Sequence, residues 1–208
     1  MAKAWPVPGV DPTADVSRNA RLILAVRIAE LYGWEPVIPH PEAIEPLHAM
    51  RISAKRLRYT LELFAETFGE AGAAALVQIK EVQELLGGLH DIDVRIALVE
   101  DEQTTTALEH ARTLGPRLAA SDGAEHQSIV SSALRPPPDD PRRGLVSLLS
   151  RQHRDRRTQY GRFIARWSEL QAGGMRRRLV TLSTPLEPLP AGVAALLHPT
   201  PTDAEETA

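Results

Sequence analysis

Apolar residues recur at helical spacing through most of the chain. Leu22, Val26 and Ala29 lie three or four positions apart, which predicts a first helix over residues 17–32 that ends at Gly33. The next stretch, "WEPVIPHPEAIEP", holds four prolines and is predicted to be a connector, because proline removes a helix donor and disfavours helix in its predecessor. The same apolar spacing predicts three longer helices: one from Glu42 or Ile44 to residue 68, one over residues 71–100 and one over residues 142–171.

The remaining segments lack this strong period. Residues 103–141 are expected to be an irregular insertion with one or two short helices, closing with the loop "RPPPDDP". Residues 1–16 are expected to be flexible, and residues 183–208, Pro-rich and then acidic, to be disordered. No strand pattern separates the helices. The sequence therefore predicts an all-α fold, an antiparallel helical bundle of about four long amphipathic helices within residues 17–182.

The amino-acid composition limits the types of chemistry that the protein can perform and indicates its cellular compartment. The 208 residues include no cysteine, which excludes disulfides, thiolate catalysis and cysteine-ligated metals, and favours a reducing cytoplasm. No uncharged stretch approaches the roughly 18 residues that a membrane span needs. We therefore expect a soluble, cytoplasmic protein.

Positive charge is concentrated in two places, although the net charge is −3. Segments 47–59 and 142–166 hold 12 of the 24 Lys and Arg residues but only one acid, Asp155. Arginine outnumbers lysine by 21 to 3, which suits forked recognition of phosphate or carboxylate. A polyanionic partner therefore remains compatible with the near-neutral average.

The segment "LHAMRISAKRLRY" orders its cations along one edge of the predicted helix 42–68. On a projection of 100° per residue, His48, Arg51, Lys55 and Arg58 fall together in a line about 15 Å long. This line borders the face expected to be buried, which comprises Leu47, Met50, Ala54, Leu57, Leu61, Phe64 and Phe68.

Two interpretations of this line stay open. The cations can be a solvated edge whose long stems cover the core while the charges remain in water. A solvated helix face usually mixes signs, however, and like charges at i,i+4 repel by a few tenths of a kcal/mol. The alternative is that an anion neutralises the line.

The predicted helix 71–100 contains an acid and a histidine on its apolar arc. His90 and Asp93 project into the arc formed by Leu76, Ile79, Val82, Leu86, Leu89 and Ala97. A buried acid is costly unless it is paired, so Asp93 is expected to bond an arginine of helix 42–68 or to orient a histidine. Gly87 and Gly88 cost about 1 kcal/mol each in mid-helix, which predicts close approach of a neighbouring helix or ligand.

The predicted helix 142–171 repeats the theme of a histidine beside arginines. Arg154 and Arg157 border one face, which is formed by Leu149, His153, Tyr160, Ile164 and Trp167. A lone histidine on an apolar face is more often packed than ligating. Three such histidines, each beside cations on a different helix, favour a shared binding role.

Three stretches resemble the CHAD family, the conserved-histidine α-helical domain. "LHAMRISAKRLRYTLELF" is similar to the family's His-x-x-Arg…Lys/Arg-Arg-Leu-Arg helix, and "LLGGLHDIDVRIALVE" to its Leu-Gly-x-x-His/Arg-Asp-x-Asp-Val helix. "HRDRRTQYGRFIARW" is similar to its later His- and Arg-rich helix. The resemblance spans about residues 17–182.

The resemblance implies non-catalytic binding of inorganic polyphosphate in a basic groove, with no cofactor, and location on polyphosphate granules. The ligand residues that it implies are His48, Arg51, Lys55, Arg56, Arg58, His90, His153, Arg154 and Arg157. Asp91 and Asp93 match the family's acidic pair, for which a structural role is expected. Many CHAD domains hold two copies of the helical unit and this chain shows one, so a homodimer that restores the second is a hypothesis.

Other functions remain open from the sequence. In a histidine phosphotransfer bundle, a lysine would follow an exposed histidine by three positions, whereas Arg51 follows His48. Nucleic acid would engage the same arginines, but no base-recognition motif or interleaved aromatics accompany them. A scaffold role is a further alternative. Metal binding is disfavoured because the three histidines have no partner at ligand spacing.

Overall fold

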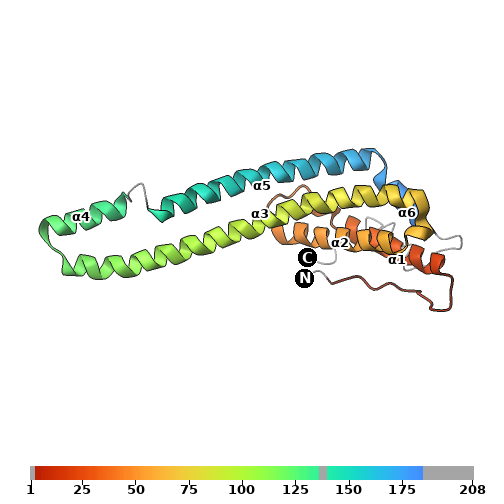
Figure 1. The fold of residues 1–208 in the computed structure, drawn as a ribbon, viewed down its shortest axis with the longest axis horizontal. Coiled ribbons are helices and arrows are strands. Elements are labelled where there is room, and N and C mark those ends of the chain that lie inside the picture. The colour runs from red at the N-terminus through yellow and green to blue at the C-terminus, as the bar shows by residue number, and fades with distance from the viewer. Residues whose placement is uncertain (1–2, 136–139, 185–208) are drawn as a thin grey trace. The chain divides into compact units, whose positions relative to one another are not determined.

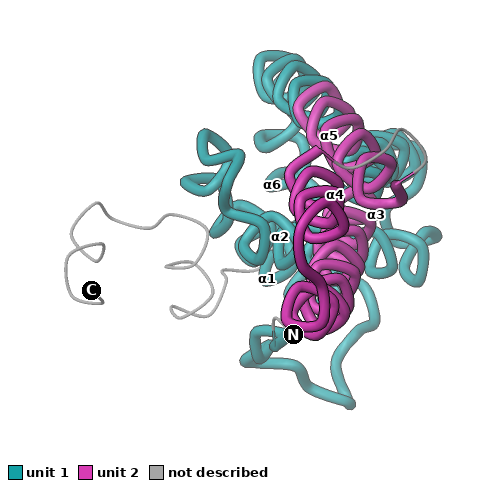
Figure 2. The backbone as a smooth tube through the Cα atoms, turned by 90° about the vertical axis from the view of Figure 1, so that its left-hand side faces the viewer, with its two compact units in different colours: residues 1–88, 159–208 teal, residues 89–158 magenta. Residues whose placement is uncertain are grey.

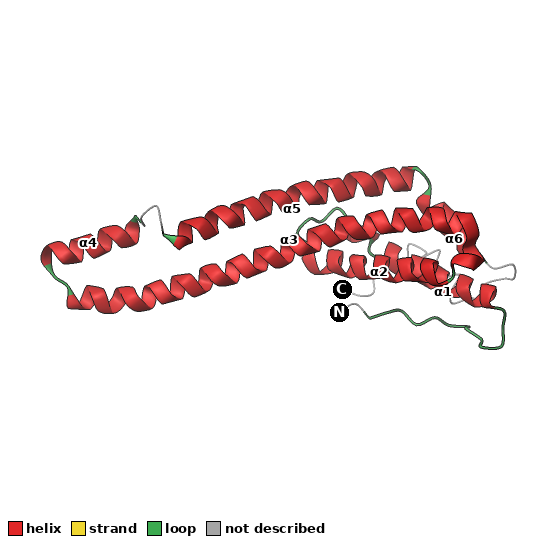
Figure 3. Ribbon diagram, in the orientation of Figure 1, coloured by secondary structure: helices red, strands yellow, loops and turns green. Residues whose placement is uncertain are grey.

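A computed structural model describes residues 3–135 and 140–184, which form helices and connecting loops without a strand (Figures 1 and 3). The helices are α1 (Val16–Tyr32), the short 3-10 helix η1 (Glu35–Val37), α2 (Ile44–Leu63), α3 (Ala65–Ala120), α4 (Gly123–Leu134), α5 (Pro141–Ala172) and α6 (Met175–Ser183). The all-α class is confirmed. The finer arrangement, an antiparallel bundle of four long helices, stays a prediction. No helix in the described part is both long and apolar enough to cross a membrane.

The first helix begins and ends where the sequence predicted. The carboxylate of Asp15 accepts a hydrogen bond from the amide of Ser17 at 2.6 Å, which satisfies one of the free donors of the first turn. The helix ends at Gly33. Predicted bounds of 17–32 and observed bounds differ by one residue.

The junction between α2 and α3 lies around a glycine with left-handed backbone. Helix α2 ends at Leu63, five residues before the predicted end at 68. Residues 65–68 form one turn of α3, and the chain then leaves helical geometry at Gly69, with φ of 55° and ψ of −147°. Only glycine adopts this conformation without steric cost, so the predicted stop at Gly69 is confirmed as a break in the helix.

The prediction of an irregular insertion is wrong for residues 103–120. Helix α3 continues through them, Pro116 included, and ends at Ala120. Strong helix formers such as Ala107, Leu108 and Glu109 favour helix here by intrinsic propensity. Apolar periodicity reports burial, and little of this segment is buried, so the period was weak. Helix α4 is one of the short helices expected. Residues 136–139 of the predicted loop, residues 1–2 and residues 185–208 of the predicted tail lie outside the described part.

The chain divides into two compact units (Figure 2), unit 1 with residues 1–88 and 159–208 and unit 2 with residues 89–158. In unit 1, α1 packs against α2 and α6. The parts of α3 and α5 in this unit run antiparallel, since Glu81 bonds Arg166 and the carbonyl of Leu85 accepts from Gln159. The largest side chains buried in this core are Leu22, Leu24, Ile28, Leu31, Met50, Leu57, Leu61, Ile79, Leu86, Phe163 and Met175.

Unit 2 contains the continuation of the same two helices. Asp93 and Arg95 of α3 bond Arg156 and Gln152 of α5, so the helices are antiparallel here too. Residues 97–135 and 140–148, which we call the low-burial segment, contain one buried residue among those described, Ile129. The core of unit 2 is therefore thin.

The packed face of α5 differs from the predicted one. The sequence placed Leu149, His153, Tyr160, Ile164 and Trp167 on it, whereas the buried residues are Gln152, Phe163, Trp167 and Leu170. The difference arises because this face of α5 also contains polar residues. Three of them form hydrogen bonds to residues of α3: Gln152, Arg156 and Gln159. A search for apolar spacing alone passes over such a face.

Gly88 in α3 allows close approach of α5, as the sequence predicted. A Cβ atom on Gly88 would lie 2.7 Å from Nε2 of Gln159, the atom that donates to the carbonyl of Leu85 at 2.9 Å. The cost of glycine in mid-helix is thus offset by an interhelical hydrogen bond.

Alanine substitutions should separate this glycine from an unconstrained one. Gly161→Ala is expected to stabilise the protein by about 1 kcal/mol, because nothing lies within 4 Å of the added Cβ. Gly88→Ala should gain none of this, because it displaces Gln159 and breaks a bond worth about 1 kcal/mol. Urea unfolding midpoints measure both. Equal stabilisation by the two substitutions would contradict the packing role of Gly88.

Candidate functional site

The predicted cation line on α2 lies beside the buried face of that helix in unit 1. Arg51, Lys55 and Arg58 are half-buried, and so is His48. The predicted core positions beside them are buried, with the exception of Phe64, which caps the helix and is half-buried: Leu47, Met50, Ala54, Leu57, Leu61 and Phe68. The projection of this helix is therefore confirmed.

Arg51 is the cation of this line whose charge lacks a protein partner. Its Nε atom is buried without a hydrogen bond, and within the described residues the side chain makes no ion pair. A Cβ atom built on Gly87 of α3 would lie 3.6 Å from that Nε. A buried donor left unsatisfied costs about 1–3 kcal/mol, more when charged, so an anion that reached Arg51 would recover this cost.

Lys55 and Arg58 both lie against Tyr59. The Lys55 Nζ is 5.7 Å and the Arg58 Cζ 4.6 Å from the centre of its ring, within the range of cation–π attraction. Arg58 also lies 3.8 Å from Glu62, which pairs more closely with Lys80 of α3 at 3.1 Å. The sequence suggested that the charges of this line are uncompensated. The structure differs at one end of the line, where Glu62 shares its charge between two cations.

Arg56 has a different role from its neighbours. Its Nη1 lies 2.5 Å from Oε1 of Glu30, an acid of α1 that is only 2% exposed. Arg27 pairs with the other oxygen of Glu30, and the amide of Trp5 donates to Oε1 at 3.3 Å. The arginine that the family motif implied as a ligand is thus part of a buried ion network that joins α1, α2 and the N-terminal segment.

In unit 2, Asp93 is buried and paired as its pattern required, but the partner differs from the predicted one. The Nε of Arg156, on α5, donates to Oδ1 of Asp93. No arginine of α2 is involved. Asp91 is exposed and has no hydrogen-bond or ion-pair partner within the described residues. No observed contact therefore supports the structural role that was expected of it.

The remaining candidates of unit 2 lie on α3 and α5. His90 and His153 are half-buried, whereas Arg154 and Arg157 are exposed. Arg154 donates to Ser150 at 3.0 Å, a contact that leaves its charge available. Arg156, the partner of Asp93, was not among the residues predicted from the sequence. Its signal was present, because it lies four positions from Gln152 and three from Gln159 on the face where α5 meets α3.

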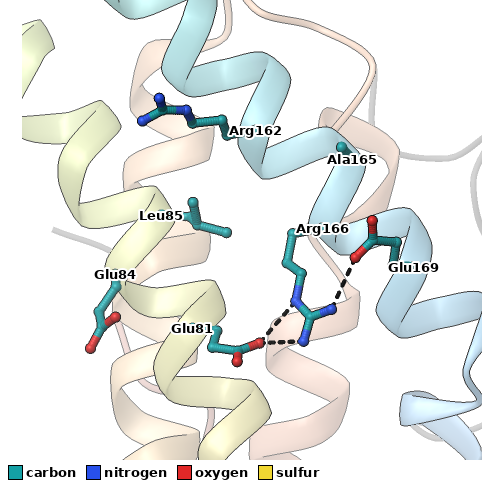
Figure 4. A pocket seen from close by; sticks show the side chains of 7 residues that line it. All are labelled: Glu81, Glu84, Leu85, Arg162, Ala165, Arg166 and Glu169. Atoms are coloured by element: carbon teal, nitrogen blue, oxygen red, sulfur yellow. Dashed lines mark hydrogen bonds and ion pairs between the residues drawn. The ribbon is translucent and has the colours of Figure 1, made fainter.

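An open cavity of about 560 Å³ lies between α3 and α5 in unit 1 (Figure 4). At one end Arg166 bonds both Glu81 and Glu169, which raises the pKa of Arg166 through these two hydrogen bonds. Arg162 lines the cavity without an ion pair within the described residues. None of the predicted ligands lines this cavity.

The described residues contain no group of three or more His, Asp and Glu side chains that would hold a metal ion. Fold and site together define an all-α protein with a cationic helix edge, in which Arg51 makes no ion pair with any residue that the structure describes. Residues 10–100 match the family model of the CHAD domain, which confirms the resemblance to that family over this part of the chain. Comparison with curated proteins and with solved structures gave no match.

The family match covers under half of the 208 residues. It includes α1, α2 and the first part of α3, and so contains the predicted residues from His48 to Asp93. The arginines and the histidine of α5 lie outside it. Their resemblance to the family's later helix stays a prediction.

Proposed function

We propose that this chain binds inorganic polyphosphate, or a similar polyanion, without catalysing a reaction. CHAD domains are generally binding domains, and some of them bind polyphosphate. The observation that carries the proposal is Arg51, whose buried Nε beside Gly87 has no hydrogen-bond partner among residues 3–135 and 140–184. An oxyanion is the chemical group that would satisfy it.

The proposed mechanism is multivalent electrostatic capture by the α2 line. Arg51 and Arg58 offer forked donors, and Lys55 offers a point charge between them. Along about 15 Å of helix these groups contact successive phosphates of one chain, so a longer chain makes more contacts per molecule. Arg56 is excluded from the ligand set because it is held by Glu30.

In unit 2, His90, His153, Arg154 and Arg157 form a second set of candidate ligands. Both arginines of this set are exposed and have no carboxylate partner within the described residues. We propose that they contact polyphosphate as well, and that binding places the protein on polyphosphate granules in the cytoplasm.

The decisive experiment compares polyphosphates of graded length with ATP, RNA and duplex DNA. All are measured at the same phosphate concentration and at fixed salt, because counterion release makes every such affinity depend on salt. Affinity is expected to rise with polyphosphate length and to exceed that for nucleic acid. RNA or DNA that displaces long-chain polyphosphate at comparable concentration would make the protein a general polyanion binder instead.

Binding should tighten as the pH falls from 8 to 6. Histidine is the side chain that changes charge near neutral pH, and a phosphate that contacts an imidazole favours its protonated form. Titration of polyphosphate affinity at constant ionic strength measures the effect. A flat profile would assign the three histidines to packing, and His48→Gln serves as the matched variant for the α2 line.

A further inference from the structure

Helix α3 carries a second apolar face in unit 2, in addition to its packed one. Val94, Leu98 and Leu108 are exposed, Leu98 at 64% and Leu108 at 54%. On a helical projection they fall within about 80° of one another and extend over about 21 Å. The buried residues Leu89 and Ile96 project to the opposite side of the helix. We call the three exposed residues the α3 stripe.

The helices around this stripe bury little within their own unit. Ile129 is the one buried residue described in the low-burial segment, and Leu134 and Val146 are exposed there as well. Most of the stability of helices in proteins comes from packing of an apolar face, and isolated helices are marginal in water. This segment therefore has the properties of a surface that is covered by a partner.

The two sides of this segment carry opposite charge. Residues 97–111 of α3 contain four acids and no Lys or Arg, whereas residues 141–151 of α5 contain three arginines and no acid. On the helical projection Asp101 falls between the residues of the α3 stripe, and Glu102 falls beside them. Within the described residues, Asp101, Glu102 and Arg143 make no ion pair.

A hollow on α5 carries charge opposite to that of the acidic part of α3. Arg142, Arg143, Val146 and Ser147 line it. Contacts of Asp93 with Arg156 and of Arg95 with Gln152 set the antiparallel register, which places Val146 at about the level of Asp101. Arg142 is already paired with Asp140 at 2.6 Å, whereas Arg143 makes no ion pair within the described residues. The hollow thus offers the apolar side chain of Val146 and the charge of Arg143 at the level of the acidic part of the stripe.

We propose that the α3 stripe docks into the α5 hollow of a second copy of this chain. Both complementary surfaces belong to one chain and lie at one level of unit 2, so a two-fold axis forms the same contact twice and the assembly closes as a dimer. Each contact buries the exposed leucines and brings Asp101 and Glu102 to Arg143, the arginine of the hollow that has no carboxylate partner within the described residues. This interface is independent of polyphosphate binding.

Sedimentation velocity of the full chain between 1 and 100 µM tests the dimer. The variant Leu98→Glu/Leu108→Glu is expected to weaken association at least about 100-fold with unchanged circular dichroism, because it places charge in an apolar contact. The control, Leu63→Glu/Val77→Glu, changes two equally exposed residues of unit 1 and should associate like the wild type. A wild type that is monomeric at 100 µM, or equal effects of both variants, would overturn the proposal.

Charge reversal tests the assigned surfaces. Glu102→Arg and Arg143→Glu should each weaken the homodimer at least about tenfold, because like charges then face each other at both contacts. In a mixture of the two variants, every contact again joins opposite charges, so dimers are expected to return. A mixture that stays as monomeric as its components would show that these surfaces do not meet.

Discussion

Replacing Arg51, Lys55 and Arg58 together by glutamate is expected to lower the affinity for long-chain polyphosphate at least about 100-fold. Each charged hydrogen bond contributes about 1.5–3 kcal/mol, and reversal adds repulsion between glutamate and phosphate. The variant should still fold, because the three positions lie beside the buried face of α2 and not within it.

Fluorescence anisotropy with labelled polyphosphate measures the loss, and circular dichroism measures the helix content. The matched control is Arg112→Glu/Arg117→Glu/Arg135→Glu, which changes the net charge equally at three exposed positions outside the proposed ligand sets. If the control lost as much polyphosphate affinity as the α2 variant, the loss would be explained by net charge alone. Loss of helix content in the α2 variant would show that the cation line is structural.

Glu30→Gln is expected to have the largest effect on stability, lowering the free energy of unfolding by about 3 kcal/mol. Glu30 is almost fully buried and bonds Arg27, Arg56 and the amide of Trp5. Removing one member of a buried ion network leaves the other charges uncompensated. Urea unfolding without polyphosphate measures the change.

Glu62→Gln is the matched control, since Glu62 also meets two cations but is 36% exposed. Exposed ion pairs contribute at most about 1 kcal/mol, so this variant should remain close to the wild type. If Glu30→Gln cost no more than Glu62→Gln, the network around Arg56 would not be structural. Arg56 would then return to the set of candidate ligands.

Helix α2 shows what the sequence was able to predict. Its apolar pattern is strong because one face is fully buried, so a projection located both the core and the cations beside it. Arg56 was included among the ligands by the family motif and not by the projection, which named His48, Arg51, Lys55 and Arg58. In the structure Arg56 bonds Glu30 of α1, a contact that a motif on one helix does not reveal.

Asp93 shows why the rest was not predictable. Its position on an apolar arc required a partner, and the structure supplies one in Arg156. A projection gives the face of one helix but not the identity of its neighbour, so the sequence named arginines of the wrong helix. The same limit concealed the polar packed face of α5, where Gln152 and Gln159 contact α3 through hydrogen bonds.

The scarcity of buried residues in the low-burial segment also has a kinetic consequence. Opening these helices exposes little apolar surface beyond Ile129, so their free energy of opening is far below that of a well-packed core. Backbone amides there exchange with solvent through local opening events, and a protease gains access by the same route. Amide hydrogen exchange and proteolysis are therefore expected to begin in this segment before they reach the core of unit 1.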